Sequence, residues 1–505
     1  HGVLSRWGIG PRAMTATIHF DNSYGRLPEQ FYSRQQPTSV AAPQLIRVNQ
    51  PLARALNIDP DWLVSKEGCL VLAGNLVPYG ADPLATVYAG HQFGSYNPRL
   101  GDGRALLLGE VIAGDGARYD LQLKGAGPTP YSRGGDGRAP LGPVLREFVV
   151  SEAMHALRIP TTRALAAVVT GEPVLRQEAL PGAVLTRIAS SHIRVGTFQF
   201  FAAQGDPGPL RQLAEYVIDR HFPSSRAGHN SIEALLRAVV RQQARSVASW
   251  QLVGFIHGVM NTDNMLLSGE TVDYGPCAFM DAYRPDAVFS SIDHGGRYAY
   301  ENQPGIAQWN LACLAQALVP ILDLDRVQAV SLAQSAIDEF QAVFRDAYGQ
   351  GMGAKLGLVE THDGDVALGS DLLTLLNHEQ DDFTLAFRRL ADLAAPVTTE
   401  EQVVEIFDFS SAYGPWLERW KNRCATDPRS TRERQQAMYD VNPAFIPRNH
   451  LVEEVIQASV TKNEFGPFHA LVNVLARPFS YRSEFVRYAK PPRPDQRVFQ
   501  TFCGT

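Results

Sequence analysis

The chain has 505 residues, of which 45% are hydrophobic and 19% are charged, as expected for a folded protein of more than one domain's length. Its net charge of −6 excludes a surface that coats nucleic acid, although a local basic cluster that binds a nucleotide is compatible with it. The five scattered cysteines form no CxxC pair, and no run reaches the ~20 apolar residues of a membrane-spanning helix, so we expect a cytoplasmic protein without nucleic-acid or membrane partners.

The first residues differ from the rest of the chain. Residues 1–13 contain no acidic side chain and precede Met14, which is typical of a natural start. We therefore expect either an added segment or an N-terminal extension before Met14. From there to about residue 80 the chain is rich in proline, and a short helical pattern occupies 52–56.

A β-rich region follows this segment. Alternating or continuous apolar residues, separated by glycine turn signals, indicate strands, and one apolar pattern at helical spacing indicates a helix. In chain order, the patterns predict strands over 104–112 and 118–124, a helix over 143–157, and strands over 164–170 and 183–188.

From about residue 196 the pattern becomes helical, except over 254–286, where short β-like pieces occur. Apolar residues at helical spacing cover 232–252, 307–350, 370–395, 400–425 and 450–475. We therefore predict an α+β fold of the protein-kinase-like, bilobal kind. A small β-rich lobe with one key helix would span 14–195, and a larger helical lobe with a cysteine-bearing tail would span 196–505.

The first candidate for chemistry is the run Gly101-Asp102-Gly103-Arg104 at the mouth of a predicted strand. Glycines there let backbone N–H groups approach phosphate oxygens closely. Lys124, at the end of the next strand, would reach the same phosphates, and Glu147 on the following helix would hold its ammonium by an ion pair. A simple turn, an exposed lysine and a solvated acid remain the alternative interpretation.

The central segment runs from His257 to Asn264 and is followed by Asp273-Tyr274-Gly275. Magnesium prefers oxygen ligands, which the Asn264 and Asp273 side chains supply. The order of glycine loop, strand lysine, helix glutamate, His…Asn loop and Asp-x-Gly is that of the protein-kinase signature. Val259, however, stands where a kinase has its catalytic aspartate, and Asp263 is the nearest substitute carboxylate.

Positive charge is the second departure from the kinase pattern. Arg187 and Arg194 join Lys124 to give three cations, and a second glycine loop, Gly134-Gly135-Asp136-Gly137, adds backbone donors. Three cations suit a buried pyrophosphate, which leaves when the α-phosphate is attacked. Alternatively, either arginine caps a helix or pairs with an acidic residue, Glu172 or Glu178.

Together these residues resemble the selenoprotein O family along nearly the whole chain, from about Phe20 to Cys503. The motifs that carry the resemblance are Tyr88-Ala89-Gly90-His91-Gln92-Phe93-Gly94, Leu100-Gly101-Asp102-Gly103-Arg104, Leu121-Gln122-Leu123-Lys124-Gly125, His257 to Met265, and Asp273-Tyr274-Gly275-Pro276. The resemblance implies a kinase fold whose ATP is turned end for end, so that AMP passes to Ser, Thr or Tyr hydroxyls of protein substrates.

The same resemblance implies a role for each site residue. Asp263 would be the base, Asn264 and Asp273 the Mg²⁺ ligands, with Mn²⁺ as an alternative metal, and Glu147 would orient Lys124. The residues that would hold ATP are Gly101, Gly103, Arg104, Lys124, Asp136, Gly137, Arg187, Arg194 and Asp273.

Two cysteines complete the expectations from the resemblance. Family members in higher organisms carry selenocysteine near the C-terminus, and Cys503 would be its sulfur counterpart. Cys277 lies shortly after Asp273, in the segment equivalent to an activation loop. The hypothesis is a redox switch in which Cys277 and Cys503 form a disulfide, and the alternative is two unrelated thiols.

Two other functions remain open on sequence grounds. A small-molecule kinase of the aminoglycoside type also carries His-Gly in its loop, but it requires the aspartate that Val259 replaces. An inactive ATP-binding scaffold would bind nucleotide and transfer nothing. The identity of the protein substrates has no sequence signal.

Overall fold

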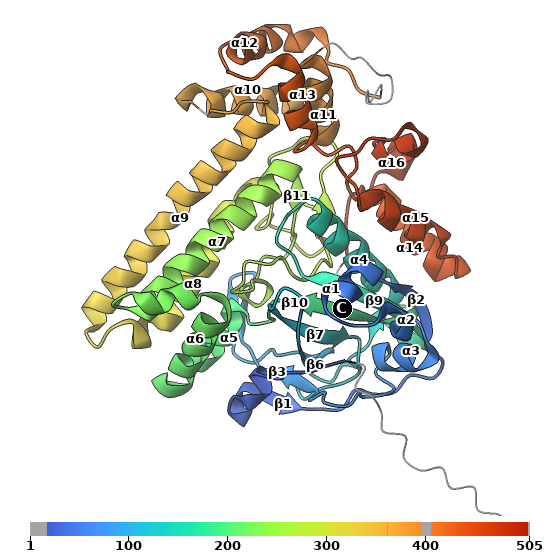
Figure 1. Cartoon of the computed structure of the whole chain (residues 1–505), viewed down its shortest axis with the longest axis vertical. Coiled ribbons are helices and arrows are strands. Elements are labelled where there is room, and N and C mark those ends of the chain that lie inside the picture. The colour runs from blue at the N-terminus through green and yellow to red at the C-terminus, as the bar shows by residue number, and fades with distance from the viewer. Residues whose placement is uncertain (1–17, 361, 396–405, 503–505) are drawn as a thin grey trace, which may run out of the picture.

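The computed structural model of the chain describes residues 18–360, 362–395 and 406–502. Its N-terminal part is an antiparallel sheet with helices, and the remainder is largely helical (Figure 1). The prediction of an α+β protein with a β-rich N-terminal part is therefore confirmed. Residues 1–13 and Met14 lie outside the described residues.

The sheet has eight strands, in the order β1-β3-β6-β7-β10-β9-β2, with β8 paired to β10. All strand pairs are antiparallel. The bounds are Tyr32–Arg34 for β1, Gln44–Val48 for β2, Leu84–Thr86 for β3, Ala105–Ile112 for β6, Arg118–Lys124 for β7, Ala139–Pro140 for β8, Arg163–Leu175 for β9 and Ala179–Ala189 for β10. The four strands expected in this region are present, and β9 and β10 extend beyond their predicted ends.

One long helix, α4 (Leu141–Ala156), packs against β9 and β10 and corresponds to the helix predicted over 143–157. Its apolar side chains share a core with α14 (Asn449–Lys462) and α15 (Gly466–Leu475), and the rings of Phe148 and Phe468 lie 5.4 Å apart. The end of the chain therefore covers the helix that carries Glu147. Three short helices, α1 (Gln50–Ala55), α2 (Pro60–Leu63) and α3 (Lys66–Leu72), precede the sheet core.

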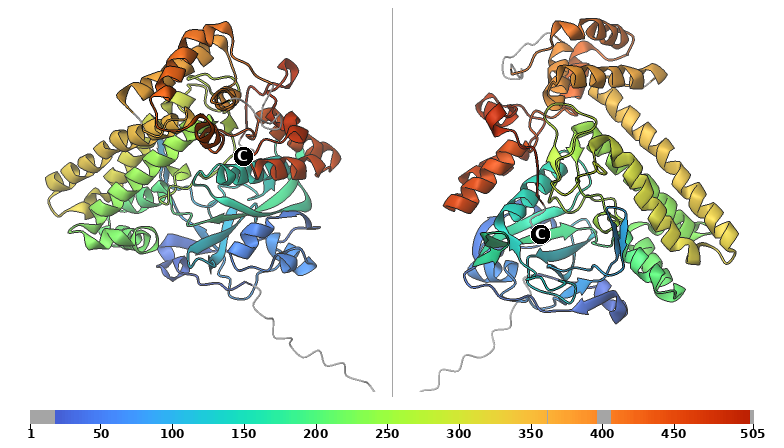
Figure 2. Two further views of the ribbon diagram at one scale, coloured as in Figure 1. Left: turned by 45° about the horizontal axis from the view of Figure 1, so that its top comes forward. Right: turned by 180° about the vertical axis from the view of Figure 1, so that it is seen from behind.

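The helical part is built around three long helices that lie side by side in Figures 1 and 2: α7 (Ser231–Val253), α8 (Gln303–Leu322) and α9 (Arg326–Lys355). The helical pattern over 307–350 contains two helices, because Asp325 begins α9 as a helix N-cap and accepts from the Val327 backbone N–H at 2.8 Å. The pattern over 370–395 likewise divides at Gln380, which has a left-handed backbone with φ 57°.

The remaining helices are α5 (Val195–Ala203), α6 (Pro207–His221), α10 (Asp363–Glu379), α11 (Phe383–Leu393), α12 (Gly414–Ala425), α13 (Thr431–Tyr439) and α16 (Val486–Ala489). Of the pattern predicted over 400–425, residues 400–405 lie outside the described part of the chain. By length and composition, one described helix, Tyr300–Leu322, resembles a membrane span, with mean hydropathy 1.4. Half of that stretch is buried within the protein, and packed core helices meet the same criterion.

Two small hairpins complete the fold. One pairs β4 (Gly90–Gln92) with β5 (Ser95–Asn97), and the other pairs β11 (Phe255–Ile256) with β12 (Ala278–Phe279). The loop that connects β11 to β12 contains the His257-to-Asp273 motifs, so a short ladder closes both ends of the candidate catalytic segment.

Candidate functional site

A cleft of about 650 Å³ brings the predicted site residues together. It is lined by the two glycine loops, by the ends of β7 and β10, and by the loop between β11 and β12. The predicted residues that line it are Gly101, Gly103, Arg104, Lys124, Asp136, Gly137, Arg187, Arg194, Asp263, Asn264 and Asp273. Glu147 lies behind this lining, where it holds two of the cations.

The expected contact between Lys124 and Glu147 is present. Lys124 is the last residue of β7, and its Nζ donates to Glu147 Oε2 at 2.6 Å. Arg187 of β10 donates from Nε to the other carboxylate oxygen of Glu147 at 2.7 Å. Burial disfavours the charged form of Glu147, but Arg187 and Lys124 outweigh burial and lower its pKa.

Asp273 is the second anion among the same cations. Its Oδ1 accepts from Lys124 Nζ at 2.9 Å and from Arg187 at 2.8 Å, and its Oδ2 accepts from Arg194 at 3.3 Å. These cations hold the pKa of Asp273 well below its ordinary value despite burial. The backbone of Asp273 is left-handed, with φ 64°, a conformation that aspartate tolerates better than most residues. The three cations therefore share the carboxylates of Glu147 and Asp273, and Arg194 also lies 3.7 Å from Asp102.

The alternative partners considered for the two arginines are not found. The partners of Arg187 and Arg194 come from the cleft itself rather than from Glu172 or Glu178. Arg194 does occupy the N-cap position of α5, but its side chain turns into the cleft and donates to the Asp263 carbonyl at 2.6 Å. Both arginines are buried, so their charges are strongly felt inside the cleft.

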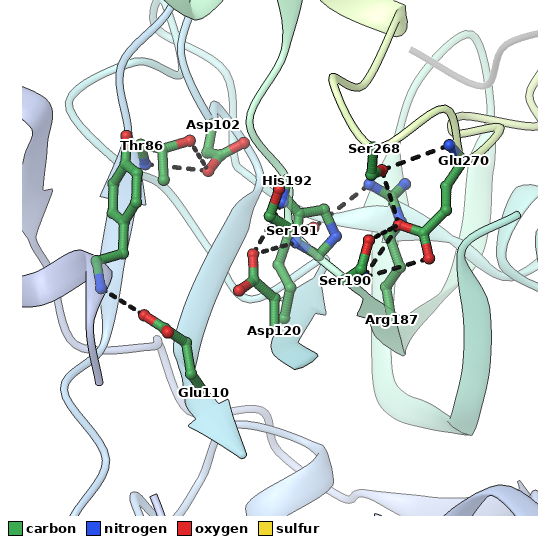
Figure 3. Close-up of polar contacts among 12 residues, drawn as sticks. Thr86, Asp102, Glu110, Asp120, Arg187, Ser190, Ser191, His192, Ser268 and Glu270 are labelled. Atoms are coloured by element: carbon green, nitrogen blue, oxygen red, sulfur yellow. Dashed lines mark hydrogen bonds and ion pairs between the residues drawn. The ribbon is translucent and has the colours of Figure 1, made fainter. Parts of the chain in front are cut away.

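Buried polar groups hold the turn that connects the two arginines (Figure 3). His192 donates to Asp120 from its backbone N–H at 2.9 Å and from its ring at 3.0 Å. Ser190 donates to Glu270 from its hydroxyl at 2.6 Å. Both ends of this turn are therefore fixed to neighbouring elements, which helps to position Arg187 and Arg194.

Hydrogen bonds and close packing hold the first glycine loop in place. Asp102 accepts from the backbone and the hydroxyl of Thr86 at 3.0 and 2.7 Å (Figure 3). Gly101 has φ 76°, and a Cβ there would lie 2.4 Å from the Tyr131 ring. Only glycine therefore lets this loop and the following segment pack so closely.

The second glycine loop is equally constrained. A Cβ on Gly137, which has φ 65°, would lie 2.0 Å from the Gly127 carbonyl. Asp136 is paired with Arg176 at 2.9 and 3.1 Å, which lowers its pKa. The Asp136 carboxylate thus has a protein partner at the rim of the cleft, in addition to its place in the lining.

Asp263 lies in a short turn, Thr262–Asn264, and is 7% exposed. Its Oδ2 accepts from Gln92 Nε2 at 3.2 Å. Its Oδ1 has no hydrogen-bond partner among the described residues and lies against Gly90, where an added Cβ would approach it to 2.5 Å. Burial raises the pKa of the Asp263 carboxyl to about 6, although Arg194 opposes this effect. A carboxylate of this kind can accept a proton near neutral pH.

The β4–β5 hairpin is the part of the site that sequence reasoning assigned no role. Besides Gln92, it donates from the His91 N–H to the Thr262 hydroxyl at 2.7 Å and from the Phe93 N–H to Asn261 Oδ1 at 3.1 Å. Three consecutive residues of the hairpin region, 91–93, are therefore hydrogen-bonded to the segment 261–263, which carries Asp263. The only sequence signal was the motif that begins at Tyr88.

His257 and Val259 form hydrogen bonds within the loop between β11 and β12 and do not line the cleft. The His257 ring is buried, donates from Nε2 to the Val272 carbonyl at 2.9 Å and accepts at Nδ1 from the Val259 N–H. Burial lowers its pKa, so the ring is neutral at physiological pH. The Val259 carbonyl accepts from Asn264 Nδ2 at 3.0 Å, which leaves the Asn264 amide oxygen as that side chain's acceptor.

The donor set suits a magnesium ion that shares its shell with phosphates. Among the described residues, no group of three or more His, Cys, Asp or Glu side chains could hold a metal ion. Asn264 and Asp273 supply one amide and one carboxylate oxygen to the same cleft, which fits a metal that takes few protein ligands. Of the two cysteines, Cys277 is buried and Cys503 lies outside the described residues.

Similar proteins show the family to which the chain belongs. The family model described as "Protein adenylyltransferase SelO" matches residues 14–476. The chain is 58% identical over 492 residues to the protein nucleotidyltransferase YdiU of Bradyrhizobium diazoefficiens, covering 97% of this chain and 100% of that protein. It is 57% identical over 498 residues to YdiU of Methylorubrum extorquens, with the same coverage of both chains. The chain therefore belongs to the SelO family of protein adenylyltransferases.

Proposed function

We propose that the chain transfers AMP from ATP to Ser, Thr or Tyr hydroxyls of protein substrates and releases pyrophosphate. The observation that carries this proposal is the placement of three buried cations, Lys124, Arg187 and Arg194, in one cleft with a carboxylate of raised pKa, Asp263. A γ-phosphoryl transferase presents the terminal phosphate of ATP to the acceptor. In this cleft, the three cations would instead enclose the terminal phosphate.

In this proposal the nucleotide is inverted relative to a kinase, with its β- and γ-phosphates on the cations and its α-phosphate toward Asp263. The glycine loops would offer backbone N–H groups to the phosphates, and Arg104 would contribute from the rim. Asp263 accepts the proton of the acceptor hydroxyl, whose oxygen forms the new bond to the α-phosphorus. The bond from that phosphorus to the bridging oxygen breaks, and pyrophosphate leaves with the electron pair.

We assign Asn264 and Asp273 as the residues that would hold Mg²⁺, or Mn²⁺ in its place. The ion would neutralise phosphate charge when bound. Asp273 now accepts from all three cations, and the phosphates would compete for those same donors. The site residues would thus exchange partners when nucleotide enters, with Glu147 keeping Lys124 and Arg187 in place.

The kinase-like, bilobal arrangement belongs to the same proposal. It is supported by the strand lysine paired to a helix glutamate and by the Asn264 and Asp273 loops between β11 and β12. The division at 195/196 follows the end of the sheet at Ala189 and the start of α5. A cytoplasmic location and the lack of nucleic-acid and membrane partners remain predictions.

Redox control is a further part of the proposal, with a disulfide between Cys277 and Cys503 as the switch. Its support is the position of the tail two residues before Cys503. Thr501 donates from its hydroxyl to the Pro276 carbonyl at 2.6 Å and from its backbone to the Phe289 carbonyl at 2.7 Å. The tail therefore reaches the residue next to Cys277.

The test uses ATP labelled separately at the α and γ positions, with magnesium and a cell lysate. We expect protein to take label from the α position only, with release of pyrophosphate. The variant Asp263→Asn should lose about 10²-fold or more of this transfer while it still binds ATP, and Asp61→Asn, an exposed aspartate, should behave as wild type. Transfer of label from the γ position to protein would indicate a kinase. If no label is transferred in the presence of either oxidant or reductant, the chain would be an inactive ATP-binding scaffold.

A further inference from the structure

We propose that the tip of the β4–β5 hairpin, together with the start of α8, forms the surface on which the protein substrate presents its hydroxyl to Asp263. We call this surface the acceptor ledge, and its residues are His91, Phe93, Tyr96, Arg297 and Trp309. The inference rests on the proposed function and names the occupant that the cleft itself does not define. That occupant is a segment of the substrate with an apolar side chain and a carboxylate near the modified hydroxyl.

The ledge begins at the catalytic carboxylate. Gln92 donates to Asp263 Oδ2, and Gly90 covers Oδ1. The neighbours of Gln92 in the hairpin, His91 and Phe93, use their backbone N–H groups to hold the Thr262–Asn264 turn. These contacts fix the hairpin against the turn that carries Asp263. A substrate segment bound on the hairpin would therefore lie close to the group that takes its proton.

The aromatic rings at the ledge form two groups, and Arg297 lies over a ring of each group. The His91 ring lies 5.0 Å from the Tyr96 ring and 5.3 Å from the Trp309 ring. The Phe93 ring lies 5.1 Å from Tyr298. Phe93, Tyr96 and Trp309 remain 37%, 42% and 36% exposed, so half of the six strongly exposed aromatic side chains in the described residues gather here. Exposed aromatic clusters of this kind mark binding surfaces.

Arg297 gives the ledge a positive charge. Its guanidinium lies 4.9 Å from the centre of the Trp309 ring and 5.8 Å from that of Tyr298. Its side chain hydrogen-bonds to the Tyr298 hydroxyl rather than to a carboxylate of the described residues, and its buried Nε has no hydrogen-bond partner there. A guanidinium that is held on two rings and whose charge is not neutralised by a neighbouring carboxylate is suited to a carboxylate of the partner.

The ledge continues into a groove between α8 and α9. This groove has a volume of about 500 Å³ and starts at Trp309. Apolar side chains line much of it, among them Ala312 and Val319 from α8 and Val330 and Ile337 from α9, together with three glutamines. Val330 is 50% exposed, and the apolar stretch that includes α8 is only half buried. A protein partner that enters from this side would cover the exposed apolar face of α8 on its way to Asp263.

The experiment measures α-label transfer against the concentration of lysate protein. For Trp309→Ala we expect the half-saturating protein concentration to rise about tenfold, with little change in maximal rate and in the dissociation constant for ATP. Val330→Asp should act in the same direction. Tyr79→Ala removes an aromatic side chain that is 75% exposed elsewhere and should match wild type.

The outcomes separate this inference from the proposed function. If wild type transfers no α-label, the proposed function fails. If it does and both Trp309→Ala and Val330→Asp saturate like wild type, the ledge is wrong. Should Trp309→Ala fold poorly, Val330→Asp and Arg297→Gln decide the matter. Modified peptides recovered from the wild-type reaction should be enriched in Asp or Glu near the modified residue, and persistence of that enrichment with Arg297→Gln would contradict the role of Arg297.

Discussion

Replacing Glu147 by glutamine tests the charge arrangement of the cleft most directly. The side chain is 3% exposed and accepts from Lys124 and Arg187 at 2.6 and 2.7 Å. Glutamine keeps the shape but removes the charge, so of the two carboxylates that pair with Lys124 and Arg187 only Asp273 would remain. Removing one partner of a buried ion pair costs about 3–5 kcal/mol, because the remaining charge stays desolvated. We expect a loss of this size in the free energy of unfolding.

The assay is urea denaturation followed by tryptophan fluorescence, with and without pyrophosphate. Because pyrophosphate supplies the missing negative charge, it should stabilise Glu147→Gln more than wild type. Glu454→Gln is the matched control, since Glu454 pairs with Arg487 on the surface and should cost about 0–1 kcal/mol. If Glu147→Gln costs no more than this control, the cations of the cleft do not depend on Glu147 and the reasoning is refuted.

Three further predictions concern other parts of the molecule. Gly90→Ala places a Cβ 2.5 Å from Asp263 Oδ1, so the turnover number should fall about tenfold or more while ATP affinity is kept; an unchanged turnover number would contradict the packing. Burial lowers the pKa of His221 in the folded protein to about 3. Between pH 6.5 and pH 3 the unfolded chain therefore binds more protons at this residue than the folded chain does. The free energy of unfolding should fall as the pH falls through this range, by at most about 1.4 kcal/mol per pH unit. His221→Gln should flatten the pH dependence of the free energy of unfolding, and an equally steep dependence would show that another group controls it. Thr501→Val removes the bond to the Pro276 carbonyl and should increase proteolysis of the tail without unfolding the core, and an unchanged cleavage rate would argue against this anchor.

The centre of the β-rich part could be predicted because its elements are long. β6 and β7 carry continuous patterns with a glycine turn between them, and α4 shows clear helical spacing over Leu141–Ala156. The edge strand β1 and its neighbour β3 have only three residues each, which is too short for a periodic pattern. They are strands because of their pairing with the rest of the sheet, which sequence spacing does not reveal.

The same contrast holds within the site. The pairing of Lys124 with Glu147 follows from their order on a strand and a helix, and the structure contains it. The surroundings of Asp263 could not be predicted, because Gln92 is 171 residues away and reaches it only through the fold. A run of glycine, polar and aromatic residues at 90–94, outside any predicted element, was the available signal. A short loop that combines glycine, polar and aromatic residues is therefore a candidate for the segment that contacts a catalytic base.

The contacts of Asp273 have a consequence for how ligands cooperate. Each oxygen of this carboxylate accepts from cations that would also serve the phosphates, and the left-handed backbone at φ 64° fixes its direction. In the proposed mode of binding, a nucleotide that draws Lys124, Arg187 and Arg194 toward itself would increase the affinity of Asp273 for a divalent ion. By thermodynamic linkage, the ion would then strengthen nucleotide binding by the same factor. Asp273 would thus couple the two ligands, so that each favours the binding of the other.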